Sequence, residues 1–134
     1  MQTNFIDKLA LIYIKDRKLL SSRSRGKDTY YIPGGKREAG ESDHAALIRE
    51  IKEELSVDIM PTTLKLFGVF ETQAHGKPEG VMIRMTCYTG EFHGELKAAA
   101  EIEEIVWLTY AGREKSSPVD KIVFERLKSE NLID

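Results

Sequence analysis

Three glutamates stand close together in one short segment, and their spacing suits the binding of a metal ion. Glu50, Glu53 and Glu54 fall within an arc of about 100° if the segment is helical, at about 100° per residue. Carboxylates this close repel one another, and a divalent cation among them removes the repulsion. Oxygen ligands of this kind suit Mg²⁺ or Mn²⁺. The alternative is a solvated, glutamate-rich helix face without a ligand.

The residues around these glutamates predict a tight turn followed by a helix. Pro33 favours an extended residue before it, and Gly34 and Gly35 permit a turn that residues with a Cβ avoid. Ser42 is the expected N-cap of the helix, and Asp43 in its first turn suits the helix dipole. The apolar face of this helix is predicted to consist of Leu47, Ile48, Ile51 and Leu55.

The same segment matches the pattern Gly-x5-Glu-x7-Arg-Glu-U-x-Glu-Glu-x-Gly-U, in which U is a bulky aliphatic residue. The matching positions are Gly35, Glu41, Arg49, Glu50, Ile51, Glu53, Glu54 and Val57. This pattern is the Nudix box, so the chain resembles the Nudix hydrolases over residues 35–57. It departs from the pattern at Ser56, where the family has glycine. A left-handed residue usually closes a helix at this position, so either serine adopts that conformation at a cost of up to about 1 kcal/mol or the helix ends differently.

The resemblance implies an α/β fold, the Nudix-type α/β/α sandwich in which a mixed β-sheet is flanked by helices. At 134 residues, the chain is expected to form a single domain over 1–134. Apolar, β-branched runs predict strands at 5–14, 19–23, 64–74 and 81–88, and another that ends near residue 108. Ser117 and Pro118 are expected to open the last helix, and 91–100 reads as a polar connection.

The resemblance also assigns roles to particular residues. The expected metal ligands are the carbonyl of Gly34 and the carboxylates of Glu50, Glu53 and Glu54. The general base is expected to be Glu53 or Glu101, with Glu104 in reserve, while Arg49 pairs with a box glutamate and orients it. The expected substrate-binding residues are Arg23 and Lys36, because a guanidinium suits phosphate oxygens. Stacking of a base is assigned to one of four aromatic residues, Tyr30, Tyr31, Phe70 and Phe92.

These expectations predict a Mg²⁺-dependent pyrophosphohydrolase, with Mn²⁺ as the alternative ion. Its substrate is expected to be a nucleoside diphosphate linked to another group, with a nucleoside triphosphate first. ADP-ribose or another nucleotide sugar is the alternative substrate. A non-catalytic nucleotide-binding module of the same fold is the alternative from another class, and Ser56 is the feature that favours it.

Composition excludes several other classes of protein. Twenty basic and 22 acidic residues give a net charge of −2, which argues against a nucleic-acid partner. No apolar run is long enough to span a bilayer, and residues 1–4 do not open a signal peptide, so the sequence predicts a cytoplasmic protein. His44, His75 and His93 are scattered and lack cysteine partners, which argues against zinc. Many family members form homodimers, and the sequence leaves the oligomeric state open.

Overall fold

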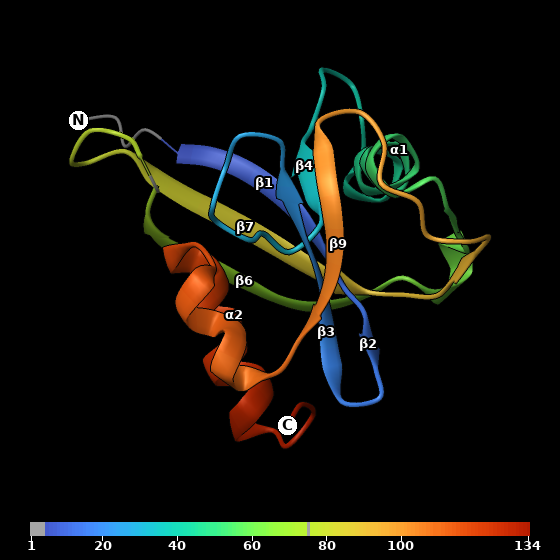
Figure 1. Cartoon of the computed structure of the whole chain (residues 1–134). Coiled ribbons are helices and arrows are strands. Elements are labelled where there is room, and N and C mark those ends of the chain that lie inside the picture. The colour runs from blue at the N-terminus through green and yellow to red at the C-terminus, as the bar shows by residue number, and fades with distance from the viewer. Residues whose placement is uncertain (1–4, 75) are drawn as a thin grey trace.

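The fold contains more residues in strands than in helices, and one α-helix lies on either side of the strands. The computed structural model describes residues 5–74 and 76–134, so residues 1–4 and His75, which both entered the sequence predictions, lie outside it. In chain order the elements are β1 (Phe5–Ile12), β2 (Ile14–Lys15), β3 (Lys18–Ser24), β4 (Gly34–Lys36), α1 (Asp43–Leu55), β5 (Asp58–Ile59), η1 (Pro61–Thr63), β6 (Lys65–Gln73), β7 (Met82–Thr89), β8 (Phe92–His93), β9 (Ile102–Leu108), η2 (Tyr110–Lys115) and α2 (Pro118–Ser129) (Figure 1).

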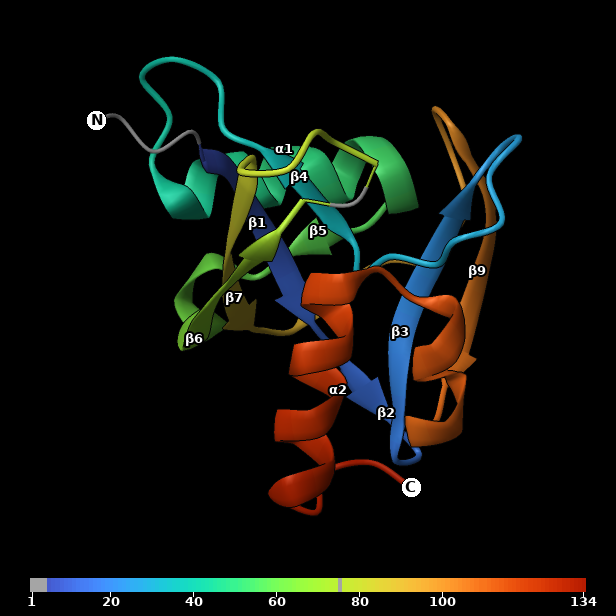
Figure 2. The same ribbon diagram turned by 90° about the vertical axis from the view of Figure 1, so that its left-hand side faces the viewer.

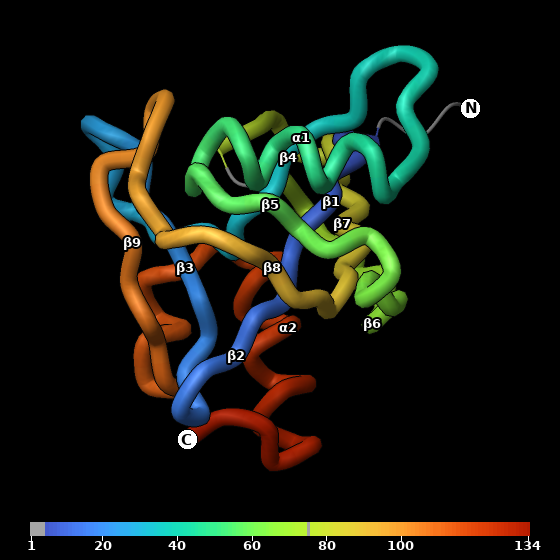
Figure 3. Tube along the Cα trace, turned by 90° about the vertical axis from the view of Figure 1, so that its right-hand side faces the viewer, coloured from blue at the N-terminus to red at the C-terminus, as the bar shows by residue number. Residues whose placement is uncertain are grey.

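The strands form a four-stranded sheet, a three-stranded sheet and a short two-stranded pair. The larger sheet has the order β4-β1-β7-β6, in which β1 and β7 are parallel and the other pairs antiparallel. The second sheet has the order β2-β3-β9, and β5 pairs with β8. Figures 1 and 2 show α1 and α2 on different sides of the strands, and Figure 3 shows β5 and β8 below α1. The predicted α/β class, with a mixed sheet flanked by helices, is confirmed.

The two sides of β1 serve two separate cores. Leu9 and Leu11 pack with the apolar face of α1, whereas Ala10 and Ile12 pack with the buried residues of α2. Because successive side chains of a strand point to opposite faces, a strand covered on both sides is apolar at consecutive positions. This explains the continuous apolar run that predicted the strand.

The structure differs from the sequence prediction at two places that shape the site. The expected strand 5–14 is interrupted at Tyr13, and its two parts belong to different sheets. Gly34 and Gly35 lie in strand β4 instead of a turn, where Gly34 is paired with Ala10. A Cβ at Gly34 would lie 1.9 Å from the carbonyl oxygen of Leu9, so this glycine is required by the close approach of β4 to β1.

The predicted N-cap of α1 is confirmed, and of the two possible ends at Ser56 the left-handed one is found. Ser42 Oγ accepts a hydrogen bond from the Ala45 amide at 3.1 Å, as an N-cap does. Ser56 has a φ of 66°, so it adopts the left-handed conformation of the family glycine, and its amide donates to the carbonyl of Lys52. The helix therefore ends as the pattern requires in spite of the serine.

The polar connection 91–100 crosses the C-terminal end of α1. The amides of Lys97 and Ala99 donate to the carbonyls of Leu55 and Glu54, each at 2.9 Å. These bonds satisfy carbonyls that the helix end leaves without partners, and they bring the start of β9 beside the box glutamates. In the described part of the chain, no helix has the length and apolarity to cross a membrane.

Candidate active site

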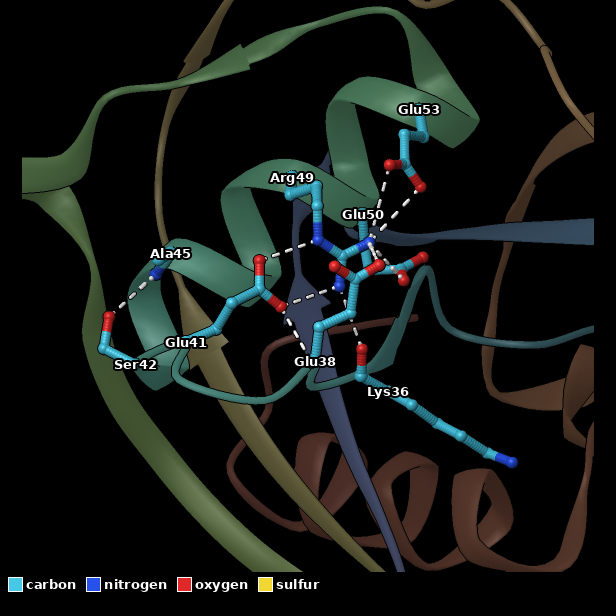
Figure 4. A network of polar contacts seen from close by, with 8 residues as sticks. All are labelled: Lys36, Glu38, Glu41, Ser42, Ala45, Arg49, Glu50 and Glu53. Atoms are coloured by element: carbon cyan, nitrogen blue, oxygen red, sulfur yellow. Dashed lines mark hydrogen bonds and ion pairs between the residues drawn. The ribbon is translucent and has the colours of Figure 1, made fainter.

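Arg49 lies at the centre of a network of acidic side chains (Figure 4). Its guanidinium donates to both carboxylate oxygens of Glu41, at 2.7 and 2.9 Å, and to Glu50 Oε1 at 2.8 Å. Glu53 lies farther away, with its nearer oxygen 3.4 Å from Nη1. The guanidinium lowers the pKa of Glu41 to about 2, so Glu41 is ionised at neutral pH. Arg49 therefore ties the loop before α1 to the acidic face of the helix.

Glu54 is the box glutamate that the fold buries most deeply. Its side chain is at the edge of the core, 8% exposed, and Oε1 accepts a hydrogen bond from the Gly34 amide at 3.3 Å. Burial is the main reason that the pKa of Glu54 is raised to about 8; the charge of Lys8 opposes this rise, and the neighbouring carboxyls of Glu101 and Glu50 contribute to it. Glu101, the residue immediately before β9, thus lies beside Glu54, although the two are 47 positions apart in the sequence.

Glu50 lies against the strand that precedes the loop. A Cβ built on Gly35 would come within 2.4 Å of Glu50 Oε2, so the carboxylate occupies the space that a side chain would take. The glycine pair therefore has two functions in the structure. Gly34 allows β4 to approach β1, and Gly35 allows the Glu50 carboxylate to approach the backbone.

The donor set fits a hard divalent cation. The carboxylates of Glu50 and Glu101 lie beside that of Glu54, and these three side chains offer oxygen ligands only. A carboxyl with a raised pKa, such as that of Glu54, binds a cation in exchange for its proton. Across residues 5–74 and 76–134, no three histidine, cysteine, aspartate or glutamate side chains are gathered as a ready metal site. A bound ion would therefore have to bring the carboxylates closer together, including that of Glu50, which is hydrogen-bonded to Arg49.

A hollow of about 180 Å³ opens beside Glu54. Its walls come from β1, β3, β4, the start of β9 and the segment before β4. The lining residues are Lys8, Ser22, Ser24, Tyr31, Ile32, Pro33, Gly34, Glu54 and Ile102. Because the most deeply buried box glutamate, Glu54, lines this hollow together with Lys8 and Tyr31, the hollow is the candidate active site.

Arg23 lies in a different hollow, which shares no lining residue with the one beside Glu54. Its guanidinium donates to Glu104 Oε1 at 2.9 Å and to the carbonyl of Lys27 at 2.9 Å. Tyr30 also donates to Glu104, at 2.6 Å, and these bonds lower the pKa of that carboxyl. Because Ser22 and Ser24 face the acidic hollow, the residue between them points away from it. Arg23 and Glu104 are therefore paired with each other outside the candidate site.

The other predicted substrate-binding residues are dispersed. The carbonyl of Lys36 accepts from Arg49 at 3.1 Å, while its side chain runs away from the carboxylates (Figure 4). Of the four aromatic residues considered for stacking, only Tyr31 lines the acidic hollow. Phe70 belongs to the core on the side of α2, and the Phe92 ring lies against that of Tyr13, with the ring centroids 4.5 Å apart and the planes tilted by 41°.

Sequence reasoning missed three polar residues of this region. Lys8 interrupts an apolar strand, and a charged residue at an inward position was the available signal. Ser22 follows Ser21 in a buried strand, and two successive serines in such a strand were the available signal for a polar surface. Asp120 lies in the first turn of α2, where its side chain is fully buried and accepts a hydrogen bond from the amide of Ile32 at 2.9 Å. No local pattern distinguishes an aspartate that is buried in the first turn of a helix from one that is exposed there.

Comparison with known proteins gives the family. The NUDIX domain model matches residues 8–127, and the chain therefore belongs to the Nudix family. A curated relative, the ADP-ribose pyrophosphatase of Methanocaldococcus jannaschii, is 33% identical over 93 residues, which are 67% of this chain and 53% of the relative. The chain thus spans about half the length of that relative.

Solved structures agree with this assignment. The ORF135 protein of E. coli has a TM-score of 0.75 and 26% identity, with 98% of this chain and 96% of that chain covered. The MutT NUDIX hydrolase from Burkholderia pseudomallei also has a TM-score of 0.75, at 19% identity, with 92% and 98% covered. At that identity the likeness establishes the fold alone.

Proposed function

We propose that the chain hydrolyses a phosphoanhydride bond of a nucleoside diphosphate linked to another group, with a nucleoside triphosphate as the first candidate. Water adds to one phosphorus atom and the bridging oxygen leaves, so a triphosphate would yield the monophosphate and pyrophosphate. The observation that carries the proposal is the buried Glu54, which lines a hollow and has the carboxyls of Glu50 and Glu101 as neighbours.

Glu50, Glu53 and Glu54, with the carbonyl of Gly34, would hold Mg²⁺ or Mn²⁺. The bound ion would neutralise phosphate oxygens and lower the pKa of a water molecule. Glu53 and Glu101 are the two candidates for the general base. Glu53 is half exposed beside Arg49, and Glu101 lies beside Glu54. Arg49 would keep Glu50 and Glu41 in place and is assigned a positioning role.

A nucleotide sugar such as ADP-ribose is the second candidate substrate. The resemblance to an ADP-ribose pyrophosphatase supports it, over 67% of this chain. The non-catalytic alternative has lost the feature that favoured it, because Ser56 adopts the left-handed conformation expected of the family glycine.

The test is release of phosphate and pyrophosphate from a panel of nucleoside triphosphates, ADP-ribose and a second nucleotide sugar, with Mg²⁺ or Mn²⁺. We expect metal-dependent turnover in the wild type and a loss of about a hundredfold or more in Glu53→Gln and Glu54→Gln. Glu130→Gln, which changes an exposed acid at the end of α2, is the matched control and should retain activity. Equal background from wild type and variants with both metals would overturn the proposal for these substrates.

A further inference from the structure

Ser56 makes a hydrogen bond that the glycine of the Nudix box could not make. Its hydroxyl donates to the carbonyl of Lys97, with 3.1 Å between the two oxygens. The backbone of Ser56 is left-handed, with a φ of 66°, and glycine adopts this conformation more easily than serine does. The serine is therefore the less favourable residue for the backbone, but it links the end of α1 to another segment of the chain.

The linked segment, residues 97–101, lies immediately before β9 (Figure 1). The amide of Lys97 donates to the carbonyl of Leu55 at 2.9 Å, so Lys97 is held by two consecutive residues at the end of the helix. Two positions farther on, the amide of Ala99 donates to the carbonyl of Glu54, also at 2.9 Å. The segment is thus fixed to the helix that carries the box glutamates.

Arg25, which follows β3, holds the other end of this segment. Its guanidinium donates to the carbonyl of Ala100 at 2.5 Å, and its amide donates to the carbonyl of Glu101 at 2.8 Å. Ala100 is itself left-handed, with a φ of 53°, so the chain turns immediately before Glu101. The residue after it, Ile102, is buried. These contacts fix the backbone on both sides of Glu101.

The position of the Glu101 carboxyl depends on this backbone, because the side chain is exposed. An exposed side chain is not held by packing, so the segment that carries it determines where its carboxyl lies. That place is beside Glu54, whose pKa the Glu101 carboxyl raises. A shift of about 1 Å in a reacting group can change a rate by about a hundredfold. Bonds that fix residues 97–101 therefore also fix a candidate general base.

We propose that Ser56 is a positioning residue for Glu101, and that Glu101 is the general base. The hydroxyl of Ser56 acts through Lys97. It holds residues 97–101 against the end of α1, so that the Glu101 carboxylate stays where it can accept a proton from the attacking water. Glycine at position 56 would give the same helix end without this link. The inference rests on the proposed function and chooses between its two candidate bases.

The experiment compares the wild type with Ser56→Gly and Ser56→Asn by steady-state kinetics with Mg²⁺. Hydrogen exchange of the Lys97 and Ala99 amides is measured in the free proteins. Ser56→Gly should lower kcat by about threefold to tenfold, the effect of losing one hydrogen bond, and leave KM unchanged. Both amides should exchange faster by a similar factor, since the segment opens more often.

The thermal midpoint of Ser56→Gly should stay close to that of the wild type, because glycine fits the left-handed position and this offsets the lost hydrogen bond. A fall in kcat at constant stability separates positioning from a general weakening of the fold. Asparagine tolerates the left-handed conformation, and its side-chain amide can donate to a carbonyl. Ser56→Asn should therefore restore both kcat and the slow exchange.

Two further proteins test whether the effect passes through Glu101. Ser56→Gly combined with Glu101→Gln should have the kcat of Glu101→Gln alone, because the base that the hydroxyl positions is already absent. Asp16→Gly is the matched control, since it also replaces a left-handed residue by glycine, in the turn between β2 and β3. It should leave kcat and the exchange of both amides unchanged.

Unchanged kcat, or unchanged exchange, in Ser56→Gly would overturn the inference. The same would follow if Ser56→Gly lowered kcat as much in the Glu101→Gln background as in the wild type. Full activity of Glu101→Gln would leave Glu53 as the base and the proposed function intact, and would remove the inference. A folded wild type that cleaves no substrate of the panel would remove both proposals.

Discussion

At the scale of single residues, one arginine organises the acidic site. Arg49 binds Glu41 through two hydrogen bonds and Glu50 through one, and it reaches the carbonyl of Lys36 as well. A guanidinium can make these contacts together because its donors lie in one rigid plane, which the single ammonium of lysine lacks. The planar arrangement of donors, and not the positive charge alone, therefore explains how Arg49 makes all of these contacts.

Replacing Arg49 by lysine tests this argument. We expect Arg49→Lys to lower kcat by about tenfold to a hundredfold, because the carboxylates it orients lose their fixed positions. The thermal midpoint should change little, since most of the network lies near the surface. The control is Arg126→Lys, which alters an exposed pair with Glu130 on α2. Unchanged kcat in Arg49→Lys would contradict the positioning role.

At the scale of elements, the start of each helix has a serine, but only one of the two serines caps its helix. Ser42 Oγ accepts from the Ala45 amide, whereas Ser117 makes no cap hydrogen bond at the start of α2. Proline at the first position of α2 has no amide hydrogen, so the start of this helix has one donor fewer to satisfy. Both α-helices therefore begin after a serine, but only Ser42 stabilises its helix by a capping hydrogen bond.

This difference predicts unequal effects of the same substitution. Ser42→Ala should lower the free energy of unfolding by about 1 kcal/mol, since the amide of Ala45 loses its partner. Ser117→Ala should cost less, because the hydroxyl of Ser117 makes no capping hydrogen bond to the amides of α2. Denaturant unfolding of both variants gives the comparison. Equal losses would mean that Ser117 makes a bond that the structure does not contain.

At the scale of the whole molecule, the C-terminal segment joins α2 to the turn between β2 and β3. The guanidinium of Arg17 donates to the carbonyl of Asn131 and to its side chain, and Asp134 pairs with the same arginine. Ile133 is fully buried in the core beneath α2, whereas its neighbour Leu132 is 39% exposed. Four residues at the end of the chain thus close one side of the fold.

A pair of neighbouring substitutions tests the importance of this closure. Ile133→Ala should lower the free energy of unfolding by about 2–5 kcal/mol, because it removes buried methylene groups and leaves a cavity. Leu132→Ala should lower it by less than about 1 kcal/mol, since much of that side chain is already in water. Thermal or urea unfolding of the two proteins distinguishes them. Similar losses for both would show that the tail is not anchored through Ile133.

The local part of this protein follows from the sequence alone. The spacing of Glu50, Glu53 and Glu54, the Ser42 cap and the left-handed end at Ser56 depend on residues within one helix and its flanks, so their geometry follows from the period of the helix. The strands at β3, β6, β7 and β9 were likewise predicted by their apolar runs and turns. The Nudix box is itself a local pattern, which is why it was readable from the sequence.

Only the tertiary structure determined which residues share a hollow. Arg23 precedes Ser24 in the chain, yet the alternation of β3 and its register with β9 turn Arg23 toward Glu104 and leave the serines beside Glu54. Lys8, Glu54 and Asp120 come together because β1 lies between α1 and α2, across more than a hundred residues of sequence. Contacts of this kind depend on strand register and on long-range packing. A local sequence pattern contains no information on strand register or long-range packing. The glutamates could therefore be predicted from the sequence, whereas the other residues that line the hollow could not.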